Sequence, residues 1–166
     1  VLHTSGTTSR PKQVPLSQRN LLSSAHAVAR TLALTGDDRC LNAMPLFHIH
    51  GLVGALLSSV YAGGSVICPE CYEEESFSRA MGDFSPSWYS AVPTIHQSIL
   101  ALVDRNPSLA RDHSLRFIRS AGGYLSPQIA EEAEQASRSE SPAAEPVATT
   151  AQAPERKQAA ADEADE

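Results

Sequence analysis

The sequence is poor in several features that define whole classes of protein. Its 13 Lys and Arg residues are outnumbered by 19 Asp and Glu residues, which gives a formal net charge of −6. Because the sequence has no excess of positive charge to attract phosphate backbones or anionic lipids, nucleic acid and membrane surfaces are poor partners. The longest apolar runs, such as Gly51–Leu57, fall far short of a bilayer span. The composition therefore predicts neither a nucleic-acid-binding protein nor a membrane-spanning helix.

Cysteine is also scarce, since 166 residues contain only three, and a disulfide framework is not expected. Cys68 and Cys71 form a Cys-x-x-Cys pair, but a zinc ribbon needs a second pair that the sequence lacks. Glu70 and Glu73–Glu75 would raise the pKa of a thiol at this place, which argues against a redox role. We therefore expect reduced thiols and no metal site.

Large apolar residues are missing from the last thirty positions. Residues 137–166 contain nine Ala and three Pro but no Leu, Ile, Phe, Met or aromatic residue, and they carry 3 basic and 7 acidic groups. Such a segment cannot bury enough surface to offset the entropy of an ordered chain. The sequence therefore predicts a domain over residues 1–136 and a disordered acidic tail, rich in Ala, Pro and Glu, over residues 137–166.

The first 136 residues alternate between strand and helix patterns. Short apolar segments bounded by Gly, Pro or Asp predict strands. Apolar residues three and four positions apart predict helices, of which the first is capped by Ser17 and the last by Ser126. The expected strands are 2–4, 39–44, 65–68, 88–92 and 115–120, and the expected helices are 18–35, 51–61, 76–84, 94–103 and 128–136. Alternation of this kind predicts an α/β fold with a layered, largely parallel sheet.

Binding residues in such a sheet gather in loops that follow the carboxyl ends of strands. Three loops have this position, namely Ser5–Lys12, Pro45–His50 and Ala121–Tyr124. In the first, hydroxyls and backbone N–H groups suit phosphate oxygens, glycine permits close approach, and lysine adds a positive charge. On composition alone, a plain Ser/Thr-rich surface turn is an equally good interpretation. The loop is not a Walker A motif, because Pro11 precedes the lysine.

The order of residues in this loop resembles the phosphate-binding loop of the adenylate-forming (AMP-binding) superfamily, which includes acyl-CoA synthetases, luciferases and peptide-synthetase adenylation domains. The family form is Thr-Ser-Gly-Thr-Thr-Gly-x-Pro-Lys-Gly, and this chain departs from it at Ser9 and Gln13. Two more motifs follow in family order, at Met44–Gly51 and Arg116–Pro127. Val14–Leu16 and the His-x-His of the second motif most resemble oxalate–CoA ligases.

The resemblance implies a two-step reaction. A carboxylate attacks the α-phosphate of ATP to give an acyl-adenylate and pyrophosphate, and the thiol of coenzyme A then displaces AMP. The complete enzyme would use Mg²⁺. The resemblance further implies three groups of site residues: the β- and γ-phosphates would be held by Thr4, Ser5, Gly6, Thr7, Thr8 and Lys12, the acyl group would lie against His48 and His50, and adenine would pack on Ala121, Gly122 and Gly123.

The sequence lacks other family motifs. It contains no Tyr-Gly-x-Thr-Glu turn, whose glutamate helps to hold magnesium in the family, and no domain with the adenylation lysine. The catalytic residues of the family are therefore unknown in this sequence. The chain also begins with Val1. We therefore expect a fragment of an AMP-forming acid–CoA ligase that is nearly inactive alone. Its acid would be oxalate first, with other short carboxylates and cinnamate-type acids as alternatives, and its compartment cytoplasmic or peroxisomal.

Two other interpretations stay open. One is a catalytically dead remnant that still binds a nucleotide or phosphate, which calorimetry on the wild type and on Lys12→Ala would detect. The other is an interaction module whose working part is the acidic tail, which deletion of residues 137–166 would reveal. For His50, a satisfied core histidine is as good an interpretation as a pocket residue.

Overall fold

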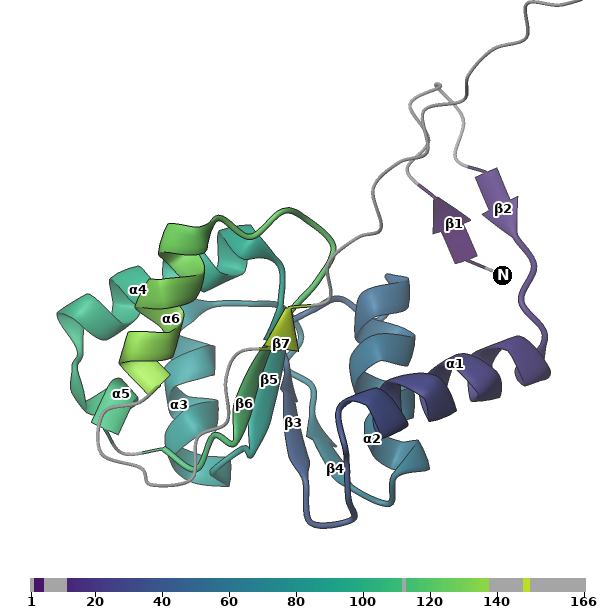
Figure 1. Cartoon of the computed structure of the whole chain (residues 1–166), viewed down its shortest axis with the longest axis horizontal. Coiled ribbons are helices and arrows are strands. Elements are labelled where there is room, and N and C mark those ends of the chain that lie inside the picture. Colours follow the sequence, from purple (N-terminus) through teal and green to yellow (C-terminus); the bar gives the residue numbers. More distant parts are fainter. Residues whose placement is uncertain (1, 5–11, 112, 138–147, 150–166) are drawn as a thin grey trace, which may run out of the picture.

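The computed structural model describes residues 2–4, 12–111, 113–137 and 148–149. A parallel sheet in the order β4-β3-β5-β6-β7 carries helices on both faces (Figure 1). The strands are β1 (Leu2–Thr4), β2 (Lys12–Val14), β3 (Arg39–Asn42), β4 (Ser65–Ile67), β5 (Trp88–Ala91), β6 (Phe117–Ser120) and β7 (Ala148–Thr149). The helices are α1 (Gln18–Thr31), η1 (His50–Leu57), α2 (Ser58–Tyr61), α3 (Glu74–Phe84), α4 (Pro93–Arg105), α5 (Ser108–Arg111) and α6 (Pro127–Ser137). The expected α/β fold is confirmed.

The alternating directions of side chains along β3, β5 and β6 divide the core into two layers. Cys40, Trp88 and Phe117 are register partners on one face, where the Trp88 and Phe117 rings stack with centroids 5.2 Å apart. The next residue of each strand points to the other face, toward the cluster that contains Phe77, Met81 and Ile99. The sheet is therefore buried on both sides, as a parallel sheet requires.

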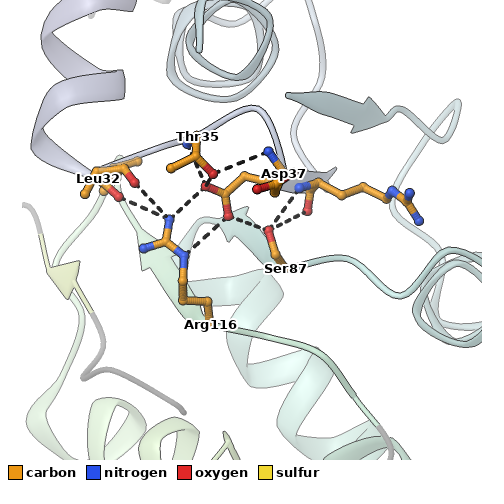
Figure 2. A network of polar contacts seen from close by, with 8 residues as sticks. Leu32, Thr35, Asp37, Ser87 and Arg116 are labelled. Atoms are coloured by element: carbon orange, nitrogen blue, oxygen red, sulfur yellow. Dashed lines mark hydrogen bonds and ion pairs between the residues drawn. The ribbon is translucent and has the colours of Figure 1, made fainter. Parts of the chain in front are cut away.

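A polar network ties the amino ends of three strands to the end of α1 (Figure 2). The Asp38 carboxylate, directly before β3, accepts hydrogen bonds from Ser87 Oγ at 2.7 Å and from Arg116 Nη2 at 3.0 Å. The same guanidinium donates to the carbonyls of Leu32 and Ala33, which follow α1 and lack helical partners. This network lies at the edge of the sheet opposite to the one where binding residues are expected.

The electrostatics of this network favour an ionised Asp38. Burial by itself would raise the pKa of the Asp38 carboxyl, but hydrogen bonds from Ser87, the Thr35 backbone and Arg116 outweigh burial. The pKa of Asp38 therefore lies below its ordinary value. The network stabilises the fold and has no feature of a ligand site.

The helix starts follow the sequence closely. Ser17 Oγ accepts from the Asn20 backbone N–H at 3.1 Å, and the Asn20 side chain accepts from the Ser17 N–H in return. Ser126 Oγ accepts from the Ile129 backbone N–H in the same way at the start of α6. The helix expected over 51–61 is present as η1, which has π-helical hydrogen bonding, followed by α2.

Several local expectations differ from the structure. The helix expected over 18–35 ends at Thr31, and the strand expected from residue 115 begins at Phe117. The strand expected to reach Met44 ends at Asn42, two residues earlier. Lys12–Val14 forms β2, antiparallel to β1, although its polar residues carried no strand pattern. Helix α5 was not expected, because it is a single turn.

In the tail expected to be disordered over residues 137–166, Ser137 is the last residue of α6, and Ala148–Thr149 forms β7 beside β6, where backbone pairing does not require large side chains. Residues 138–147 and 150–166 lie outside the described residues.

Candidate functional site

The last rung of the sheet on the η1 face is polar. Asn42, Ser90 and Arg119 are register partners on β3, β5 and β6, one step beyond the layer of Cys40, Trp88 and Phe117. All three polar side chains are buried. Buried polar residues need partners, so a row of them at the carboxyl edge of a parallel sheet marks a candidate site. We call Asn42, Ser90 and Arg119 the polar rung.

Arg119 is the unusual member of the polar rung. Its side chain lies against η1, where a methyl group at Gly54 would come within 2.8 Å of Nη1. Nη1 donates to Ser90 Oγ at 3.1 Å. Within the part of the chain that the structure describes, no carboxylate forms an ion pair with Arg119. Burial accordingly lowers the pKa of the guanidinium, and an anion is the partner that this charge lacks.

His50 completes the network from the first residue of η1. Its Nε2 lies 2.6 Å from Ser90 Oγ, whereas its Nδ1 is buried and has no hydrogen-bond partner. Burial lowers the pKa of His50 to about 4, with smaller contributions from Arg119, His96 and His48. The imidazole is therefore neutral at pH 7.

The turn after β6 lies directly against this histidine. Ala121 donates its backbone N–H to the Ala91 carbonyl at 3.2 Å, and Gly122 has φ of +85°, the left-handed region that favours glycine. A methyl group at Gly122 would lie 3.7 Å from His50 Nδ1. The sequence predicted adenine contact for the Ala121–Gly123 turn and an acyl pocket for His50. In the structure the turn and this histidine lie next to each other.

His48 is separated from the polar rung. Its side chain is exposed and lines a cleft of about 340 Å³ together with His3, Val14 and Leu16. The cleft lies between the β1–β2 hairpin and the loop that leads into η1. His48 thus faces the hairpin, while His50 alone joins Ser90 and Arg119.

The predicted phosphate loop is only partly visible. Ser5, Gly6, Thr7 and Thr8 lie outside the described residues. The structure does place the two ends of the loop side by side, because Thr4 and Lys12 are register partners in the hairpin. The Lys12 side chain is exposed.

The other cavities and side-chain clusters of the described residues do not suggest a binding or catalytic site. An apolar cavity of about 40 Å³ lies under α4, α5 and α6 on the opposite face of the sheet from the polar rung, and none of the candidate residues lines it. In the described part of the chain, no group of three or more His, Cys, Asp or Glu side chains is placed to hold a metal ion. None of the described helices combines the length and apolar character needed to cross a membrane.

Comparison with known proteins decides the family. The model of the AMP-binding enzyme family matches residues 1–145. This chain belongs to the AMP-binding enzyme family. An oxalate–CoA ligase of Arabidopsis thaliana is 46% identical over 139 residues, which cover 81% of this chain and 26% of that protein. An oxalate–CoA ligase of Saccharomyces cerevisiae is 42% identical over 127 residues, 76% of this chain and 23% of that protein.

A solved structure of another AMP-binding enzyme has the same fold. It is a malonyl-CoA ligase in a ternary product complex with methylmalonyl-CoA and AMP, with a TM-score of 0.73 and 32% identity. The match covers 82% of this chain and 30% of that one. This member of the AMP-binding family therefore spans about a quarter of the length of the curated relatives it matches.

Ser90 and Arg119 escaped the sequence-based prediction, although the sequence contained a signal for both. Three predicted strands share the pattern apolar, apolar, polar, in Cys40–Asn42, Trp88–Ser90 and Phe117–Arg119. When the strands pair in parallel, the three polar residues must fall on one rung and one face. The pairing register was the missing information.

Proposed function

We propose that this chain is the acid-binding part of an ATP-dependent, AMP-forming acid–CoA ligase, and that its acid is small and carries a second anionic group, oxalate first. The observation that supports this proposal most strongly is Arg119, a buried guanidinium without an acidic partner at the carboxyl edge of the sheet. A monocarboxylate that presents its only carboxylate to ATP would leave this cation uncompensated.

The surroundings of Arg119 support a short acid. The stacked rings of Trp88 and Phe117 lie one layer below, and helix η1 covers the same face. Large rings packed directly below the polar rung favour a short acid over a long chain. One carboxylate would pair with Arg119, and the other would lie toward Gly122, where His50 Nδ1 is available.

The remaining roles follow the family pattern. Thr4, Ser5, Gly6, Thr7, Thr8 and Lys12 would hold the β- and γ-phosphates of ATP. His48 would line the acyl pocket, and the Ala121–Gly123 turn would pack against adenine. ATP and coenzyme A are co-substrates. The described residues offer no cluster of carboxylates for Mg²⁺, so we place its ligands in other parts of the ligase.

A chimaeric enzyme tests this proposal. Residues 1–137 replace the aligned segment of the Arabidopsis oxalate–CoA ligase, and formation of the oxalate thioester is measured with ATP and coenzyme A. We expect activity with oxalate and little with acetate. Arg119→Met in the chimaera should lower kcat/KM for oxalate by about 100-fold or more, the usual effect of removing a buried charge partner. Equal activity with acetate, or an unaffected Arg119→Met variant, would refute the proposed substrate class.

A further inference from the structure

Ser90 lies between His50 and Arg119 and contacts both side chains. Its hydroxyl is completely buried, lies 2.6 Å from His50 Nε2, and accepts a hydrogen bond from Arg119 Nη1 at 3.1 Å. A hydroxyl has one proton to donate and two lone pairs to accept with. Where that proton goes determines which nitrogen of His50 carries a hydrogen.

The arginine settles the direction of the chain of hydrogen bonds. A guanidinium has only donors, so Ser90 must accept from Arg119 and cannot donate to it. In the described part of the chain, the acceptor within hydrogen-bond distance of the Ser90 hydroxyl is His50 Nε2. If Nε2–H donated to Ser90 instead, the buried hydroxyl proton would have no acceptor among the described residues, so the arrangement in which Ser90 donates to Nε2 satisfies more polar groups. Since a neutral imidazole carries one proton, that proton is on Nδ1.

The Nδ1–H group then has no hydrogen-bond acceptor among the described residues. Nδ1 is buried without a partner, and the nearest backbone turn is that of Gly122. A buried donor without an acceptor is destabilising, and an oxygen of a bound ligand at this place would satisfy it. Any larger residue at Gly122 would meet both the ring and Val92, which lies 3.2 Å from the position of an added methyl group.

We propose that Ser90 is a positioning residue that holds His50 as a neutral Nδ1–H donor, directed at an oxygen of the acid that the site binds. The ligand half of this inference rests on the proposed function, whereas the choice of tautomer does not. His50 thus acts as a donor and neither as a base nor as a cation. Arg119 supplies the positive charge. Its hydrogen bond fixes the orientation of the Ser90 hydroxyl, and that hydroxyl fixes the tautomer of the imidazole.

The tautomer is measured by nitrogen NMR on the whole 166-residue chain with ¹⁵N-labelled histidine. The sequence has six histidines, and His50→Asn identifies the His50 signals. In the wild type we expect a protonated Nδ1 and an unprotonated Nε2 between pH 6 and 8. A protonated Nε2 in the wild type would overturn the inference without the help of any variant.

Two serine variants separate positioning from general stability. In Ser90→Ala the fixed tautomer should be lost, so that the two nitrogens of His50 exchange their protons and their shifts move toward each other. Ser120→Ala is the matched control, because Ser120 is also a buried serine at the end of a strand and its Oγ has no partner. This control should leave the His50 signals in place. An unchanged tautomer in Ser90→Ala would overturn the positioning role.

Sodium oxalate then tests the ligand half. Oxalate should shift the His50 Nδ1 resonance in the wild type by saturable binding, and at least tenfold more oxalate should be needed in Ser90→Ala. Binding of oxalate that leaves His50 unmoved would overturn the inference. If the tautomer is as stated and the wild type binds no oxalate, the proposed function fails while the role of Ser90 in setting the tautomer stands.

Discussion

Arg119 is the residue in which stability and function are most clearly opposed. A buried guanidinium without an acid costs free energy in the free protein, and this cost is absent when an apolar residue of similar length replaces it. We therefore predict that Arg119→Met leaves the free energy of unfolding unchanged or raises it by about 1–2 kcal/mol. Urea denaturation measures this difference. A loss of more than about 1 kcal/mol would show that Arg119 is a structural residue.

Gly122 provides a second test at this scale. Its φ of +85° and the 3.2 Å approach to Val92 strain any larger residue, so Gly122→Ala should lose about 1–2 kcal/mol of stability. Gly82, inside α3, is the matched control, because an added methyl group there meets nothing within 4 Å. Gly82→Ala should be neutral or stabilising by up to about 1 kcal/mol. Thermal unfolding of both variants decides the comparison, and equal effects would contradict it.

At the residue scale the motifs named His50 and Gly122, and a methyl group added at Gly122 would lie 3.7 Å from His50 Nδ1. The site roles of both residues stay predictions. The partners of His50 could not be found in this way, because Ser90 and Arg119 lie 40 and 69 positions away along the chain and meet it only through strand pairing. The roles predicted for the phosphate loop and for His48 stay predictions.

Helices and strands that are determined by nearby residues were predicted, whereas strands that depend on a distant neighbouring strand were not. Helices α1, α3, α4 and α6 follow from apolar spacing and caps, and all of them were predicted within a few residues. Strands β2 and β7 are two or three residues long, and their existence depends on a neighbouring strand that offers hydrogen bonds. Local sequence contains no record of such a neighbour, so both strands were missed.

The network that joins α1 to three strands carries a prediction at the element scale. Asp38→Asn would leave Arg116 without its ionic partner among the carbonyls of Leu32 and Ala33. We expect a loss of about 2–4 kcal/mol, measured by urea denaturation at pH 7. Asp37→Asn is the control, since Asp37 is adjacent and exposed, and it should change stability by less than about 0.5 kcal/mol. Similar losses in both variants would contradict the assigned role of the network.

At the scale of the whole molecule, the residues at the amino ends of the strands and those at the carboxyl ends (the amino edge and the carboxyl edge) differ in how fully they are hydrogen-bonded. The amino edge holds Asp38 and Arg116 in a satisfied network, and the carboxyl edge holds Arg119 and His50 with bonding capacity left over. The paired network stabilises the fold, whereas the unpaired groups at the carboxyl end agree with the proposed acid site. Asp38→Asn should therefore lower stability, whereas Arg119→Met should weaken binding of the acid without lowering stability.

The acid response of the molecule follows from its buried histidines. Burial lowers the pKa values of His50 and His96 to about 4, below the ordinary value of about 6.5. The unfolded chain therefore binds protons that the folded chain does not, so stability is complete above about pH 6.5 and falls as the pH drops toward 4. The contribution of Asp38 persists lower and is lost only as the pH falls through its own depressed pKa.

Urea midpoints between pH 7.5 and 4.5 measure this response. The midpoint should be constant above about pH 6.5 and fall from there to pH 4.5, and the double variant His50→Gln/His96→Gln should show a flatter dependence on pH below pH 6.5. Asp38→Asn should remove stability at pH 7 without changing the slope between pH 7 and 5. A wild-type midpoint that is constant from pH 7 to 5 would contradict the buried, neutral histidines.

The most direct test of the account is a calorimetric titration of the 166-residue chain with oxalate and, separately, with acetate. The account predicts saturable oxalate binding with a Kd of about 1 mM or tighter, binding of acetate at least tenfold weaker, and no oxalate binding by Arg119→Met. If Arg119→Met binds oxalate as the wild type does, or if acetate binds equally well, the buried guanidinium is not the receptor for the second anionic group. The proposed acid site would then be wrong.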